Sequence, residues 1–230
     1  MYTHKLVHSH PQSYIDNLVH QLASSDRNEK LAAVTTMRDL AATTKCDNRG
    51  IISAAIDAIP RLVALLGPLN PTGMQSAAIQ TLKSLCDSPG LLGISNRAKV
   101  IEFGAIPLLV DLLGPENSEI HLQVVQALQS LSVNGEQNVS IVTSAGAIPH
   151  LVALLGCLTP EDVQEAATGV LMSLANNNAQ NKARIVDAGG VVALRLLFQS
   201  STSPSVKNAS ALLIFDNVRL FFLLHFAPCK

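Results

Sequence analysis

The chain has 230 residues, of which 48% are hydrophobic and 14% charged, and its formal net charge at pH 7 is −1. This balance predicts a folded, core-rich protein and excludes a disordered chain. The sequence has no dense run of Lys and Arg to displace counterions from phosphates, so we expect no nucleic-acid partner. Scattered cysteines without a CxxC pair or a signal peptide indicate reduced thiols in the cytoplasm or the nucleus: Cys46, Cys86, Cys157 and Cys229.

Residues 1–25 are expected to form a flexible N-terminus and a capping helix. From about residue 13 the apolar side chains share one helical face, which would cover the open end of a repeat array: Ile15, Leu18, Val19 and Leu22. His4, His8 and His10 have no partnering Cys/His pair at structural-zinc spacing, so we predict no metal site.

A string typified by SAGAIPHLVALLG at 144–156 recurs within residues 26–214. Its copies, aligned on Pro60, Pro107, Pro149 and Val192, are 47, 42 and 43 residues apart, which fits stacked helical repeats of roughly 40 to 47 residues. Leucines two and five residues after that position have helical spacing: Leu62, Leu109, Leu151 and Leu194, then Leu65, Leu112, Leu154 and Leu197. The proline is predicted at the first helical position, and a left-handed cap is expected at Gly67, Gly114 and Gly156.

Further amphipathic segments flank each copy. EQNVSIVTSAG at 136–146 and QNKARIVDAGG at 180–190 predict a short helix that ends at glycine. A longer helix is predicted after each copy and before the first: LAAVTTMRDL at 31–40, SAAIQTLKSL at 76–85, HLQVVQALQSL at 121–131 and VQEAATGVLMSL at 163–174. Each repeat therefore has three helices, which bury their apolar faces only by stacking into one continuous core.

Two segments depart from the repeat. CDSPGLLGISN at 86–96 is expected to be an inserted loop with Leu91 and Leu92 at its tip, either contacting a partner or folded back on its own repeat. In the last unit, the counterpart of Leu174 is Asp216, and four of the six phenylalanines lie in the final 16 residues. Residues 215–230 are therefore predicted to be an atypical aromatic tail, too short in its apolar run to span a bilayer. We expect the array to be truncated there relative to a longer parent protein.

These motifs resemble the armadillo-repeat family over about residues 25–214. The resemblance depends on the Gly-Ala-Ile-Pro string, the Leu-Val-x-Leu-Leu that follows it and the Ala-Leu-x-Ser-Leu end of the third helix. It implies an all-α fold, a right-handed α-solenoid or superhelix of three-helix repeats. It also implies a concave groove, lined by third helices, that holds an extended segment of a partner protein.

The resemblance places a candidate binding groove on the third helices. Importin-alpha members grip basic signals with Trp and Asn, whose counterparts here are Gln80, Gln126 and Gly169, then Ser84, Ser130 and Ser173. With no Trp in the chain, cation–π contacts worth about 0.5 to 2 kcal/mol each are lost, which argues against import cargo. Arg38 and Lys83 are too few for a beta-catenin-like basic groove. The candidate groove is a neutral ladder, able to bond a peptide backbone: Thr35, Asp39, Gln80, Ser84, Gln126, Ser130, Gly169 and Ser173.

No motif for catalysis is present. The sequence has no GxSxG, no phosphate-binding Gly-rich loop, no HExxH and no CxxC, so we expect neither an enzyme nor a cofactor or small-molecule substrate. The prediction is a protein-interaction scaffold in the cytoplasm, the nucleus or both, without a transmembrane segment. The alternative is the substrate-recognition fragment of a larger ubiquitin ligase with a U-box and armadillo repeats. The 25 residues before the array are too few for a U-box, so we expect no ligase activity from this chain alone.

Overall fold

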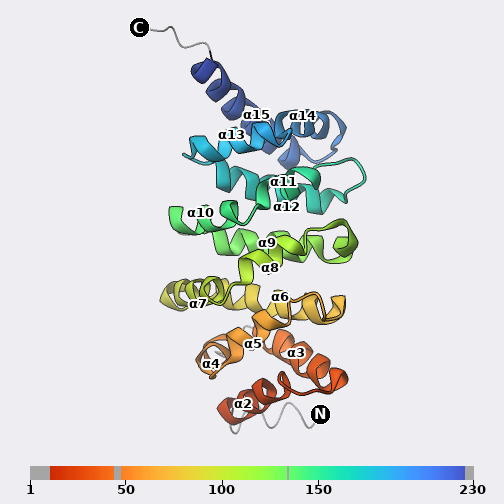
Figure 1. Ribbon diagram of the computed structural model, residues 1–230, viewed down its shortest axis with the longest axis vertical. Helices are drawn as coiled ribbons and strands as arrows, with labels where there is room; N and C mark the ends of the chain where they lie inside the picture. The colour runs from red at the N-terminus through yellow and green to blue at the C-terminus, as the bar shows by residue number, and fades with distance from the viewer. Residues whose placement is uncertain (1–10, 44–47, 134, 226–230) are drawn as a thin grey trace. The chain divides into compact units, whose positions relative to one another are not determined.

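The computed structural model describes residues 11–43, 48–133 and 135–225, and all its regular elements in these ranges are helices (Figure 1). The chain divides into two compact units, residues 1–109 and 110–230. The first contains α2 (Pro11–Gln21), α3 (Arg27–Ala42), α4 (Asn48–Ala54), α5 (Ala58–Ala64), α6 (Thr72–Cys86) and α7 (Gly90–Glu102). The boundary falls within α8 (Ala105–Asp111). The second contains η1 (Pro115–Ile120), α9 (His121–Ser132), α10 (Glu136–Ser144), α11 (Ala147–Ala153), α12 (Glu161–Ala175), α13 (Ala179–Asp187), α14 (Gly190–Ser200) and α15 (Pro204–His225).

Three helices per repeat are confirmed. The third helix is the longest in each repeat except that of α7, α8 and α9, where α7 has 13 residues and α9 has 12. In the first unit the third helices α3 and α6 pack against each other. In the second unit α12 packs against both α9 and α15. In the repeats α4–α6, α10–α12 and α13–α15, the first and second helices pack against their own third helix, so these helices bury one face in a layer shared with their neighbours.

The leucine stripe of the second helices forms the core, as the helical spacing predicted. Both sets of leucines are buried: Leu62, Leu109, Leu151 and Leu194, then Leu65, Leu112, Leu154 and Leu197. The prediction of proline at the first helical position is wrong by two residues. Pro60, Pro107 and Pro149 occupy the third position of α5, α8 and α11. Proline is tolerated there because the first four N–H groups of a helix have no intrahelical partner.

The predicted left-handed caps at Gly67, Gly114 and Gly156 are also wrong, since positive φ values occur elsewhere. Gly104, Gly146 and Gly189 have φ from 78° to 84° and lie at the turn between the first and second helices. Asp57 holds the same position in the first copy with φ 63°. The predicted glycine end of the first helix is thus confirmed, and it is this turn that needs the conformational freedom of glycine.

Side chains of the third helices contact the main-chain carbonyl oxygens of Gly67, Gly114 and Gly156. The amide Nε2 of Gln75 donates to the Gly67 carbonyl at 3.1 Å, and that of Gln164 donates to the Gly156 carbonyl at 2.7 Å. In the middle repeat, His121 Nε2 lies 2.9 Å from the Gly114 carbonyl oxygen. These three side chains, Gln75, His121 and Gln164, are the turn latches of the repeats. They add a side-chain contact to carbonyls that lie just after the second helix and that each also accept the backbone N–H three residues later.

An asparagine on the first helix makes a matching contact with the preceding third helix. Nδ2 donates to a main-chain carbonyl in three copies, from Asn48 to Leu40 at 3.1 Å, from Asn96 to Leu85 at 2.9 Å and from Asn181 to Leu174 at 2.8 Å. All three asparagines are buried. Because a buried carbonyl without a partner is costly, these bonds fix how each first helix meets the end of the third helix before it.

The segment at 86–96 is not a loop. Helix α7 begins at Gly90, so only residues 87–89 connect it to α6, and the extra residues lengthen a first helix. Leu91 is exposed, but it lies on the first turn of a helix and not at a loop tip. Gly93 permits this packing, because a Cβ there would lie 2.0 Å from the Ser88 carbonyl oxygen.

The ends of the described chain are helical. In α2 the predicted apolar face is buried: Ile15, Leu18, Val19 and Leu22. The three N-terminal histidines lie outside the described residues. Helix α15 continues past residue 214 to His225, so the predicted tail begins within a helix. Within the described ranges, no helix is both long and apolar enough to cross a membrane.

Candidate protein-binding surface

The eight predicted groove residues lie in pairs, one helical turn apart, on four third helices. They are Thr35 and Asp39 on α3, Gln80 and Ser84 on α6, Gln126 and Ser130 on α9, and Gly169 and Ser173 on α12. Packing of α3 on α6 brings the first two pairs onto neighbouring helices, and packing of α9 on α12 does the same for the last two. Most are exposed or half-buried. We name these eight residues the third-helix ladder.

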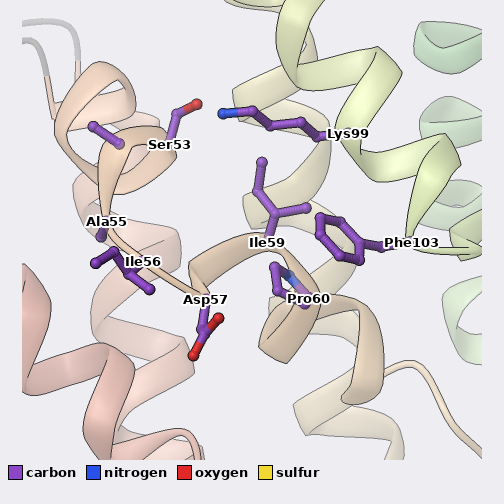
Figure 2. A pocket seen from close by; sticks show the side chains of 9 residues that line it. Ser53, Ala55, Ile56, Asp57, Ile59, Pro60, Lys99 and Phe103 are labelled. Atoms are coloured by element: carbon purple, nitrogen blue, oxygen red, sulfur yellow. The ribbon is translucent and has the colours of Figure 1, made fainter.

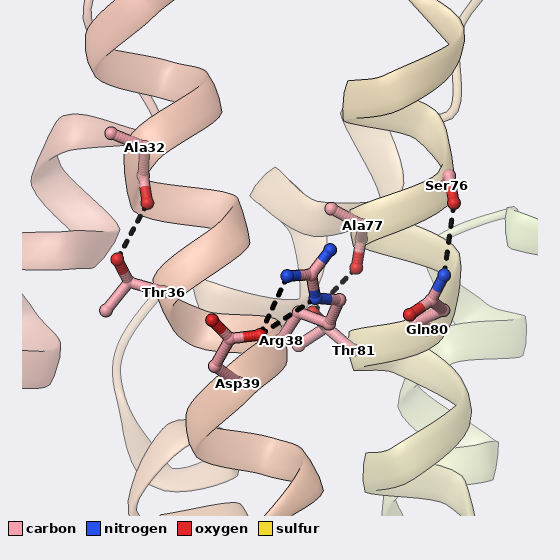
Figure 3. A network of polar contacts seen from close by, with 8 residues as sticks. All are labelled: Ala32, Thr36, Arg38, Asp39, Ser76, Ala77, Gln80 and Thr81. Carbon is pink, nitrogen blue, oxygen red and sulfur yellow. Dashed lines mark hydrogen bonds and ion pairs between the residues drawn. The ribbon is translucent and has the colours of Figure 1, made fainter.

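In the first unit, the ladder side chains with polar contacts are bonded within their own helix (Figure 3). Asp39 is exposed and pairs with Arg38, whose NH2 lies 2.8 Å from its Oδ1. The Gln80 amide donates to Ser76 Oγ at 3.1 Å. Surface pairs of this kind are weak and easily exchanged. The first unit therefore presents a polar surface whose charges are balanced locally.

In the second unit, the serines are bonded back to their own helices. Ser130 Oγ donates to the Gln126 carbonyl and Ser173 Oγ donates to the Gly169 carbonyl, both at 3.1 Å. Each hydroxyl has thus used its proton and keeps only acceptor capacity for a ligand. Ser130 is only 8% exposed, so its role as an open groove residue is not supported in this structure, whereas Ser173 is exposed.

Gly169 stands where the resemblance would put a large aromatic residue. A Cβ at this position would lie 3.6 Å from Nε2 of Gln129, so the Gln129 side chain of α9 lies beside the glycine of α12. Where the resemblance implies a tryptophan ring, this surface has the amide group of Gln129. This part of the surface can exchange hydrogen bonds but cannot stack on a cation.

Glu161, at the start of α12, holds the chain that leads into α15. Its Oε1 accepts from Ser201 Oγ at 2.7 Å, from the Ser203 N–H at 3.0 Å and from the Thr202 N–H at 3.1 Å. The hydrogen bond from the Ser201 hydroxyl, then those from the backbone, hold the pKa of Glu161 below its ordinary value. This carboxylate has a structural task, and the sequence analysis missed it because its partners lie forty residues away.

The thiols that the structure describes are both unpaired. Cys86 is buried and Cys157 is exposed. Burial raises the pKa of the Cys86 thiol to about 12, so it stays protonated at neutral pH. In the described ranges no three His, Cys, Asp or Glu side chains are grouped to hold a metal ion.

A hollow of about 240 Å³ in the first unit was not predicted (Figure 2). It lies where the turn between α4 and α5 meets helix α7. Six of the residues that line it are Ser53, Ile56, Asp57, Pro60, Lys99 and Phe103. Figure 2 shows the Lys99 side chain extending across one rim and Phe103 facing Ile59 and Pro60. None of its lining residues belongs to a third helix.

Comparison with known proteins identifies an armadillo repeat in this chain. The model of the armadillo/beta-catenin-like repeat matches residues 95–133, which run from within the first helix α7 through the second and third helices, α8 and α9. The chain contains an armadillo/beta-catenin-like repeat and has the fold of armadillo-repeat proteins. A designed armadillo repeat protein solved in complex with the peptide (KR)4 shares its fold, with a TM-score of 0.72 over 90% of this chain and 81% of that one, at 22% identity.

Natural armadillo relatives match over part of their length. Human catenin delta-2 is 32% identical over 136 residues, which are 58% of this chain and 11% of that protein. U-box domain-containing protein 1 of Medicago truncatula is 30% identical over 162 residues, which are 66% of this chain and 22% of that protein. The matched part of this chain therefore spans about a tenth to about a fifth of the length of these two relatives.

Proposed function

We propose that the chain is a protein-interaction scaffold that holds an extended segment of a partner protein against its third helices. The observation that carries the proposal is the third-helix ladder, which places uncharged or locally paired side chains on neighbouring third helices within each unit. A designed protein of the same fold is solved with a bound peptide, which supports this use of the fold. The fold also supplies rigid helices rather than loops to hold the contact residues, and rigid sites lose little entropy on binding.

The chemistry of the ladder suits a neutral peptide backbone. Gln126 offers an amide with both donors and acceptors, and Ser173 keeps acceptor lone pairs for a backbone N–H. Cationic segments would lack aromatic walls at Gly169, and acidic segments would lack a row of Lys or Arg. We therefore propose a partner segment that is extended and of low net charge.

Photo-crosslinking tests the proposal. A photo-reactive phenylalanine replaces Gln126 on α9, and in a matched chain it replaces Gln137, which is exposed on the first helix α10 of the same unit. Irradiation in lysate, followed by mass spectrometry, should yield adducts from the Gln126 position that the Gln137 position does not give. Identical adduct sets from the two positions would refute a binding role for the third helices.

A charge-introducing pair of variants gives an independent test. Gln126→Glu with Ser173→Arg alters the ladder, and Gln137→Glu with Ser140→Arg makes the same changes on exposed positions of α10. Partners bound through the ladder should be lost from the first variant and retained by the second. Ser173 is chosen over Ser130, because an arginine at the buried Ser130 would disturb packing.

A second candidate is that the chain recognises substrates for ubiquitin ligation. The similarity to U-box domain-containing protein 1 favours it. In this case the partners captured by the ladder should acquire ubiquitin when E1, E2, ubiquitin and the endogenous protein isolated from its source are combined, and the 230-residue chain by itself should not catalyse discharge. For either candidate we propose a cytoplasmic or nuclear setting, which agrees with the unpaired thiols of Cys86 and Cys157.

A further inference from the structure

The repeats provide internal comparisons for the hollow of the first unit. The residue before the left-handed position is Ile56 or Phe103 in the first two copies of the string and Ala145 or Ala188 in the last two. Ile56 is 84% exposed and Phe103 is 47% exposed, and both line the hollow. Single exposed apolar residues are common, but two large ones around one hollow are typical of an interaction site.

The charges around the hollow are unequal. Asp57 lies in the left-handed region, where the other copies have glycine, and its Oδ2 is 3.6 Å from NH2 of Arg61. Ser53 donates its hydroxyl proton to Asn96. Lys99 is exposed and joins no ion pair among the described residues. The hollow therefore combines apolar walls with one ammonium group that lacks a counter-charge.

We propose that this hollow binds a segment of a partner protein in which a large apolar side chain stands next to a carboxylate. The apolar side chain enters between Ile56, Phe103 and Pro60, and the carboxylate pairs with the Lys99 ammonium. Such an anchor with an adjacent charge pair is how small docking sites combine affinity with orientation. Since no third-helix residue lines the hollow, it is independent of the proposed function.

A protein segment fits the hollow better than a lipid surface does. Membrane-binding faces carry several Lys or Arg around a broad apolar strip, because each cation adds only a little attraction to anionic lipid. Here one cation stands at the rim of a concave hollow, which matches a single side chain and a single acidic group.

The experiment is a selection with a displayed library of random nine-residue peptides. The library is selected on the intact chain and depleted on the variant Ile56→Ser with Lys99→Glu. Both side chains are exposed, so this variant keeps its core. The retained peptides should contain a large apolar residue within two positions of Asp or Glu. Their affinity should fall about tenfold or more with Lys99→Glu alone and should be kept by Lys99→Arg.

Matched controls locate the site. Arg184 occupies the same repeat position as Lys99 in the last copy and is exposed, so Arg184→Glu should leave the affinity of the selected peptides unchanged. Gln80→Glu, on the third-helix ladder, should leave it unchanged as well. This separates failure of the hollow from failure of the proposed function.

Three outcomes would overturn the proposal. The first is that no peptide survives depletion on the double variant. The second is that the survivors bind the Lys99→Glu chain as tightly as the original. The third is that vesicles of phosphatidylcholine and phosphatidylserine at 3:1 bind the parent chain but not the Ile56→Ser variant, which would assign the hollow to membrane binding.

Discussion

Truncation of a single core leucine measures how far the second helices support the fold. Leu151 lies on α11 and is 0% exposed, and α11 packs against α12, α13 and α14. Leu151→Ala removes three carbon atoms, whose transfer from water contributes about 0.8 kcal/mol each, and it leaves a cavity that adds to the loss. We expect the free energy of unfolding to fall by about 3 kcal/mol, which lowers Tm by roughly 6 to 12 °C in a chain of this size.

The matched control is a leucine seven residues later. Leu158 lies in the turn before α12 and is 97% exposed, so Leu158→Ala should change the free energy of unfolding by no more than about 0.5 kcal/mol. Urea unfolding followed by circular dichroism compares the two variants with the parent chain. Equal midpoints for Leu151→Ala and Leu158→Ala would refute the assignment of the leucine stripe to the core.

Three further results are expected. Gln164→Leu removes the side-chain donor to the Gly156 carbonyl, which keeps the bond from the Thr159 N–H, and should destabilise the chain by about 1 kcal/mol in urea unfolding; an unchanged midpoint would show that the glutamine amide does not stabilise this turn. Iodoacetamide at pH 8 should modify Cys157 and spare Cys86, whose pKa is about 12, and peptide mass spectrometry reads the ratio; equal modification would contradict the burial of Cys86. Glu161 has a lowered pKa in the folded chain, so its ionised form stabilises the fold above the ordinary value of 4.5, and this contribution is lost as pH falls below it. The difference in Tm between the parent and Glu161→Gln should therefore be constant near neutral pH and shrink in acid; a difference independent of pH would refute the role of the carboxylate.

The sequence predicted the helices and their buried faces because apolar residues at helical spacing mark the face that a helix packs against a core. Leu62 and its counterparts must face a core, and any stack of helices satisfies that requirement. Glycines were less informative, because glycine serves several conformations. Gly146 takes a left-handed turn, whereas Gly156 has an ordinary φ and a carbonyl held by Gln164. The side chain that distinguishes the two, Gln164, lies near the start of the third helix α12 and outside the repeated string.

The sequence predicted which helices carry the eight ladder residues but not the surroundings of their side chains. Counting from the end of each third helix placed them on α3, α6, α9 and α12, yet it could not show that Ser130 is buried or that Ser173 donates back to its own helix. Those facts depend on how tightly neighbouring helices pack. The hollow was missed because it joins residues of two consecutive repeats. The aligned copies of the string do contain a sign of the hollow, because Ile56 and Phe103 stand where the later copies have alanine.

The turn latches also make the connections between the second and third helices tolerant of change. Residues 68–70 and 157–159 differ in sequence, yet the carbonyl before each is held by a glutamine that lies outside the connection. A surface segment whose end is fixed from outside can lengthen at little cost, because loop-closure entropy grows slowly with length. These connections are therefore the positions at which an epitope, a fluorophore or a second recognition loop can be grafted onto the chain without shifting its helices.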